Sequence, residues 1–201
     1  MKKLIIKTAL ITFAAAIAFC AVLYGCIAAF SPSTLVGFYR DLGNDKRALD
    51  YSIRAYEKDG KSQDSLFTVI ECAIRAEDDE KIIFFANELF SRKIENTDES
   101  YLSRIEGRLC RSLIRTGKKE EGVSKAAAFS AAHLKTEDGA KLTLLPSEDL
   151  IAYAAELKDT ALLKNIYLSL CAVKDQMYDS LCESGKARLD EDISKLSALN
   201  A

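Results

Sequence analysis

The spacing of apolar residues along this chain predicts helices almost throughout. From position 33 onward, apolar side chains recur three and four residues apart, which is the period of an α-helix with one buried face. Short polar connections separate these stretches. With nine Gly and two Pro among 201 residues, the chain lacks the turn residues that a β-sandwich needs. We therefore expect an all-α protein.

The first thirty residues follow a different pattern. No charged residue occurs between Thr8 and Phe30, and a helix of that length extends about 35 Å, enough to cross a hydrocarbon core of about 30 Å. Lys2, Lys3 and Lys7 precede this stretch, so the N-terminus is expected in the cytoplasm and the rest outside. The sequence predicts a single-pass protein of the cell membrane, with an anchor over 1–30 and an extracytoplasmic domain over 31–201.

Three fates of the anchor remain open. It is longer than a cleaved signal, so we expect it to be retained. The segment Ile27-Ala28-Ala29 is a weak cleavage site, which would give simple secretion. The segment Leu23–Cys26 resembles a bacterial lipoprotein signal, although Tyr24 is bulky for that motif, so lipidation of Cys26 is a further alternative.

Small residues recur every four positions along one face of the anchor, at Ala21, Gly25 and Ala29. Such a face lets a second membrane helix approach closely, so we predict pairing there and a possible homodimer. The alternative is that small residues are simply common in membrane helices.

The first two helices after Pro32 carry a recognisable set of residues. Leu35, Tyr39, Gly43, Ala48 and Ala55 resemble the hydrophobic, aromatic, turn and small positions of the tetratricopeptide repeat. The match is close over 33–60. Steps of 34, 40 and 40 residues from Ala48 lead to Ile82, Gly122 and Leu162, each in a similar setting, so in architecture the resemblance covers 31–172.

This resemblance implies a short α-solenoid of stacked helical hairpins. In that family the first helix of each pair lines a concave groove that holds extended peptides or partner helices. A last helical region from Gln176 to Leu199, interrupted near Gly185, would cap the stack. Helix boundaries agree with such hairpins: Gly60 and Gly117 close helices, and Ser147 and Asp159 open them.

One predicted helix carries a row of arginines. Arg104, Arg108, Arg111 and Arg115 are spaced by four, three and four residues, which places them within about 60° of arc on one face. Guanidinium groups bind carboxylates and phosphate bidentately, so the row is a candidate partner-binding site. The alternative is a solvated row, or one paired within the chain to the acidic segment 77–80.

Composition excludes several functions. The formal charge of −2 argues against nucleic-acid binding. His133 is the only histidine and no CxxC occurs, so we expect no catalytic residues, metal or cofactor. The four cysteines beyond the anchor fit a packed interior, with a Cys171–Cys182 disulfide as the alternative.

The sequence thus predicts a membrane-anchored scaffold, not an enzyme, that captures a peptide or helix of a protein partner in its groove. One alternative is a structural subunit of a membrane complex. Another is a lipid- or ligand-binding helical protein, or an enzyme with an unrecognised site.

Overall fold

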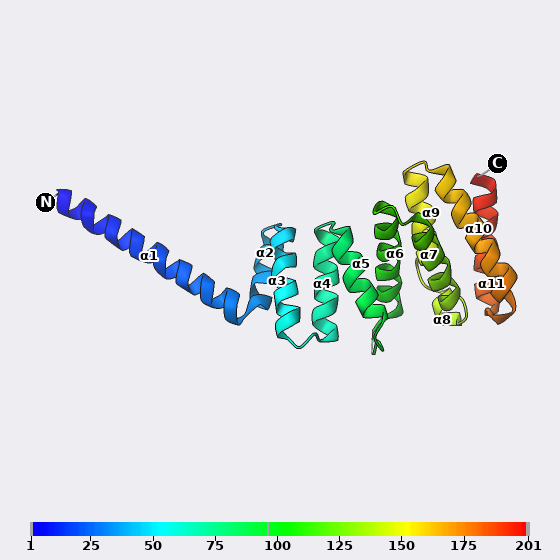
Figure 1. The fold of residues 1–201 in the computed structure, drawn as a ribbon, viewed down its shortest axis with the longest axis horizontal. Coiled ribbons are helices and arrows are strands. Elements are labelled where there is room, and N and C mark those ends of the chain that lie inside the picture. Colours follow the sequence, from blue (N-terminus) through cyan, green and yellow to red (C-terminus); the bar gives the residue numbers. More distant parts are fainter. Residues whose placement is uncertain (1, 96, 200–201) are drawn as a thin grey trace. The chain divides into compact units, whose positions relative to one another are not determined.

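The computed structural model describes residues 2–95 and 97–199, and every regular element in that part of the chain is helical, which confirms the all-α prediction. The elements are α1 (Lys2–Phe30), α2 (Pro32–Asp41), α3 (Asp45–Lys58), α4 (Gln63–Arg75), α5 (Asp79–Phe90), α6 (Glu99–Arg115), α7 (Lys119–His133), α8 (Glu137–Ala140), α9 (Pro146–Glu156), α10 (Thr160–Met177), the 3-10 helix η1 (Tyr178–Ser180) and α11 (Glu183–Leu199). Figure 1 colours them by their position in the sequence.

The helices gather into two compact units, of which the first ends at Ala76 and the second begins at Glu77. The first unit contains α1 to α4 and the second contains α5 to α11. The predicted boundary at residue 31 falls inside the first unit, so the apolar helix shares that unit with the helices that follow it.

Helix α1 contains a stretch that is long and apolar enough to cross a membrane. This stretch, Leu10–Ala29, has a mean hydropathy of 2.4, and none of it is buried within the protein. Only Ser31 separates α1 from α2, which starts at Pro32, a residue suited to the first helical turn.

In the first unit, α2 packs against α3 and α3 packs against α4 (Figure 1). The α2–α3 turn forms as the sequence predicts: Gly43 takes a positive φ of 68°, which only glycine adopts without strain, and the side chain of Asn44 accepts a hydrogen bond from Arg47 N at 3.2 Å. Between the helices, Leu35 and Tyr39 of α2 and Ala48 of α3 are buried. The small side chain at position 48 allows the close packing of α2 on α3.

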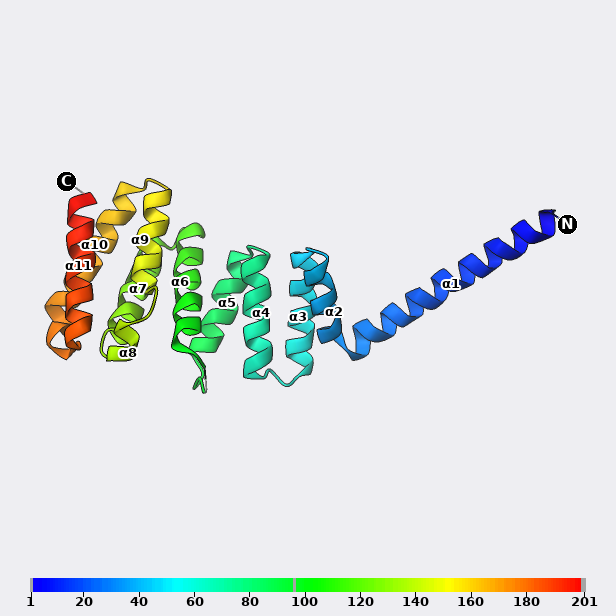
Figure 2. The same cartoon turned by 180° about the vertical axis from the view of Figure 1, so that it is seen from behind.

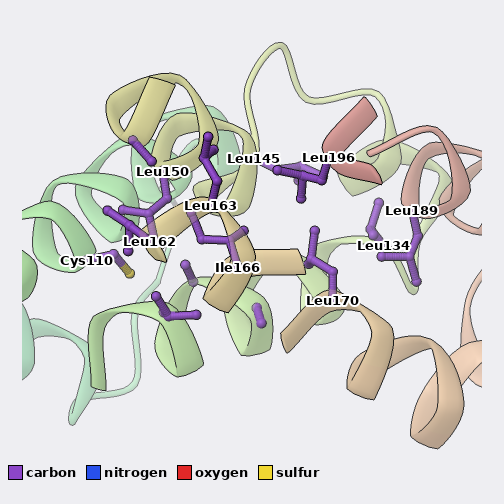
Figure 3. Packing of buried hydrophobic residues seen from close by; sticks show 14 of the residues in the cluster. Cys110, Leu134, Leu145, Leu150, Leu162, Leu163, Ile166, Leu170, Leu189 and Leu196 are labelled. Carbon is purple, nitrogen blue, oxygen red and sulfur yellow. The ribbon is translucent and has the colours of Figure 1, made fainter. Parts of the chain in front are cut away.

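In the second unit, one continuous apolar core joins α6, α7, α9, α10 and α11 (Figure 3). Its largest fully buried side chains include Leu150, Leu162 and Leu170. Figure 2, from the opposite side, shows α10 beside α11, which are in direct contact. Leu189 and Leu196 of α11 are buried in this core, so the last helix covers one side of it.

Two details differ from the sequence-based expectation. Helix α9 starts at Pro146 with Leu145 as its N-cap residue, two positions before the predicted cap at Ser147, and the Glu148 carboxylate accepts a hydrogen bond from Leu145 N at 2.9 Å. The interruption predicted near Gly185 lies instead between Met177 and Glu183, and α11 runs through Gly185 without a break.

Candidate functional site

The four arginines of α6 divide into two pairs with different surroundings. Arg111 is bound within the protein: its Nε donates to Asp149 Oδ2 at 2.6 Å, a terminal nitrogen donates to Oδ1 at 2.5 Å, and its guanidinium lies 5.2 Å from the centre of the Tyr153 ring. Because Asp149 and Tyr153 belong to α9, Arg111 joins α6 to α9.

Arg115 is also paired within the chain. Its Nε lies 3.1 Å from Asp79 Oδ2, at the start of α5. This partner belongs to the acidic segment 77–80 that the alternative interpretation named. Both arginines at the C-terminal end of the row therefore hold neighbouring helices in place.

Arg104 and Arg108, at the N-terminal end of the row, are exposed and line a pocket of about 270 Å³. The guanidinium of Arg104 lies over the Tyr101 ring, 5.0 Å from its centre. The opposite wall is the segment 142–145, in which Leu144 is 46% exposed. The pocket thus combines two cations with accessible apolar surface; its remaining lining residues are Ser100, Ser103 and Asp149.

Hydrogen bonds fix the wall of this pocket. Ser103 Oγ donates to Leu144 O at 2.8 Å. Arg188 of α11 donates to Ala140 O at 2.8 Å and to Leu142 O at 2.6 Å, and its Nε donates to Glu148 Oε1 at 2.7 Å. The segment 140–145 is thus held by α6 on one side and by α11 on the other. The shape of the pocket is therefore preorganised for a partner.

The first unit holds a larger, open cavity of about 670 Å³ between α2, α3 and α4. Arg40 and Lys58 border it, and most of its other polar lining comes from hydroxyl groups, such as those of Ser52 and Thr68. The resemblance to tetratricopeptide repeats implies a groove along α2, the first helix of its pair. No spacing of residues in the sequence predicts the hydroxyl groups that line the cavity.

A buried pair that the sequence did not reveal lies on α6 and α7. His133 Nε2 and Glu106 Oε2 are 2.7 Å apart, and both side chains are nearly buried. The hydrogen bond to Glu106 raises the pKa of His133. The signal available in the sequence was weak: Glu106 stood apart from both the apolar and the arginine faces of its helix.

Nearby, burial and the charge of Glu106 raise the pKa of the Cys110 thiol to about 12. A thiol with so high a pKa stays protonated and is a poor nucleophile. The three residues therefore do not form an activated cysteine site, and the Glu106–His133 pair joins α6 to α7 as a structural contact.

Among the residues that the structure describes, no cluster of three or more His, Cys, Asp or Glu side chains has an arrangement suited to a metal ion. Cys171 and Cys182 are both free thiols, so the alternative of a disulfide between them is wrong.

The predicted pairing face of α1 is unobstructed. Ala21, Gly25 and Ala29 are exposed, and nothing lies within 4 Å of a Cβ placed at Gly25. The face is open to a second helix, and the pairing stays a prediction.

Comparison with family models, curated proteins and solved structures gives no match to this chain.

Proposed function

We propose that this protein is a membrane-anchored scaffold of tetratricopeptide-like helical hairpins, which binds an acidic segment of a protein partner through Arg104 and Arg108. The N-terminal helix retains it in the cell membrane, and the helical units lie on the extracytoplasmic side. The anchor raises the effective concentration of the binding surface at the membrane, so the apparent affinity for a weakly binding peptide of a membrane partner increases.

The observation that carries the proposal is the pocket beside α6. Two exposed guanidinium groups border it, while its carboxylate, that of Asp149, is already bound by Arg111. Arg104 and Arg108 thus line a pocket whose own carboxylate is already paired with Arg111. A carboxylate from a partner can take a bidentate hydrogen bond there, and an adjacent apolar side chain can contact Leu144.

The test is photo-crosslinking of the full-length protein in native membranes, followed by identification of the adducts. The double variant Arg104→Glu/Arg108→Glu is expected to lose the principal adduct. The matched control Lys135→Glu/Lys164→Glu changes the net charge equally at two exposed positions of the same unit and is expected to keep that adduct. An identical set of adducts in wild type and the arginine variant would remove the proposal.

A second candidate function rests on the cavity of the first unit. Its volume of about 670 Å³ suits a small polar ligand, so a ligand-binding protein is the alternative. Arg40→Gln would then abolish binding of that ligand in a thermal-shift screen of anionic compounds, while leaving the crosslinked partner unchanged.

A further inference from the structure

The C-terminal end of the apolar helix is built into the first unit. Tyr24 lies inside the apolar stretch Leu10–Ala29, yet its hydroxyl is 2.7 Å from that of Tyr39 on α2 and 2.5 Å from that of Tyr51 on α3. In addition, Lys58 Nζ donates to Ala29 O at 3.0 Å, which satisfies one of the carbonyl groups that a helix leaves unpaired at its end.

Aromatic and basic side chains surround this junction. The rings of Tyr39 and Tyr51 stack at 5.4 Å, and the Phe38 ring packs edge-on against Tyr39 at 5.3 Å. Arg47 donates to the Tyr39 hydroxyl at 3.2 Å, and the Arg54 guanidinium lies 5.2 Å from the centre of the Tyr51 ring.

The three cations form one row on α3. Positions 47, 54 and 58 fall within about 40° of arc, and all three side chains are exposed. The nearest acids on the same helix, Asp50 and Glu57, lie about 60° to 80° away from the centre of the row. The row therefore presents positive charge beside the end of α1.

A lipid hydrocarbon core cannot hold this arrangement at low cost. A charged side chain at the centre of a membrane helix is costly even by the mildest scale. Tyrosine, arginine and lysine instead concentrate at the membrane surface, where rings contact acyl chains and the polar ends reach water and phosphate. The tyrosines that bind Tyr24 therefore favour a position for it at the membrane surface.

We propose that Tyr24 to Ala29 lie above the hydrocarbon, within the headgroup layer, and that Arg47, Arg54 and Lys58 bind the phosphate groups of membrane phospholipids. The proposal rests on the membrane anchoring included in the proposed function, and it does not depend on the partner-binding pocket of the second unit.

The chain has enough apolar sequence to accommodate this shift. If the hydrocarbon ends near Leu23, the segment Leu4–Leu23 crosses it, and its 20 residues extend about 30 Å as a helix. Lys7 is the only charged residue in this segment and lies one turn from its start, so its amine can reach the cytoplasmic headgroups.

Two natural cysteines measure the depth. Cys20 lies below the proposed boundary and Cys26 above it, about 9 Å further along the helix. The full chain carrying Cys171→Ser and Cys182→Ser, reconstituted in phospholipid nanodiscs, is treated with a charged maleimide. We expect Cys26 to react at least tenfold faster than Cys20, and the signal to disappear in a further Cys26→Ser variant.

Each outcome decides between the claims. If both cysteines are protected until detergent is added, the headgroup placement is wrong while the anchor stands. If both react equally fast, α1 does not cross the membrane, and the anchoring part of the proposed function fails together with this inference. An intact mass that shows lipid attached to Cys26 overturns the inference as well.

The phosphate contact has its own test. Native mass spectrometry of the full chain extracted in mild detergent counts the phospholipids that remain bound. Arg54→Gln is expected to retain several-fold less phospholipid than wild type, whereas Lys46→Gln, an exposed lysine on another side of α3, is expected to match wild type. Equal retention in all three proteins overturns the proposed contact.

Discussion

Glu106 and His133 form a buried pair whose contribution to stability depends on pH. The pKa of His133 is raised by its hydrogen bond to Glu106. Because the folded pKa lies above that of the unfolded chain, the stabilisation is complete below the unfolded value of about 6.5 and is lost as pH rises through the folded pKa.

We expect His133→Gln to remove this component. Glutamine can still donate a hydrogen bond to Glu106 but does not titrate, so the free energy of unfolding should depend less on pH between about pH 6 and pH 8 than in wild type. Urea unfolding across this range is the measurement. A variant that keeps the full wild-type pH dependence would show that the pair contributes nothing to it.

Asp192 is a second buried titratable group, and burial is the main influence on its charged form. It is 4% exposed, and burial together with the nearby charge of Glu148 raises its pKa to about 6. Since the folded pKa of this acid lies above its unfolded value of about 3.9, the penalty for the buried carboxylate is complete above about pH 6, shrinks as pH falls, and is gone only below about pH 4.

Asp192→Asn is therefore expected to stabilise the second unit by roughly 1–3 kcal/mol at pH 8, with a much smaller effect at pH 4. Chemical unfolding at the two pH values distinguishes this titration from a general packing effect, which would change stability equally at both. A loss of stability at pH 8 would contradict the assignment.

At the scale of helices, Arg111 and Asp149 join α6 to α9 with side chains that are only 21% and 16% exposed. Asp149→Asn should lower the free energy of unfolding by roughly 1–3 kcal/mol, because it leaves a mostly buried guanidinium without its carboxylate. The control Lys119→Gln breaks the more exposed pair with Asp159 and should change stability little. Similar losses in both variants would argue against a special role for Arg111.

At Gly185, helix α11 lies close to the backbone of Leu134, the residue that follows α7. A Cβ at Gly185 would lie 2.2 Å from Leu134 O, which accepts a hydrogen bond from Cys182 N at 3.1 Å. We expect Gly185→Ala to destabilise the second unit by about 1–3 kcal/mol because α11 must shift. Thermal unfolding measures this, and Ala187→Ser, at an exposed position of the same helix, is the control.

The glycine also shows where prediction from sequence stops. Local signals such as Gly43, Asn44 and Asp159 act within one turn of the chain, and the structure places those caps and turns as predicted. From its sequence context Gly185 predicts a helix break, whereas the structure requires glycine there because the backbone of Leu134, 51 positions earlier, leaves no room for a Cβ. Long-range contacts of this kind leave no periodic trace in a sequence.

The same limit applies to the arginine row. Its spacing predicted one face of α6 correctly, because helical periodicity is local. The ion pairs of Arg111 and Arg115 depend on Asp149 and Asp79, which lie on other helices. The sequence offered the acidic segment 77–80 as a partner but not Asp149, 38 residues beyond Arg111.

For the whole molecule, the lysines at the N-terminus predict a cytoplasmic start and extracytoplasmic helical units. In sealed membrane vesicles with the outer face exposed, an externally added protease is then expected to digest the epitope-tagged C-terminus while an N-terminal tag survives. A tag at the C-terminus that is degraded only after lysis would reverse the predicted orientation. The result also decides on which side a partner must be sought.

The single residue between α1 and α2 limits how far the protein can reach. A domain on a long flexible linker can occupy many positions relative to its anchor. Here α2 follows directly after Ser31, and Tyr24 and Ala29 of α1 form hydrogen bonds to α2 and α3. With α1 in the membrane, as we propose, the first hairpin is held at a fixed distance from the lipid surface. Any molecule that docks on it must come down to the bilayer, which favours clients that are themselves membrane residents over those diffusing freely.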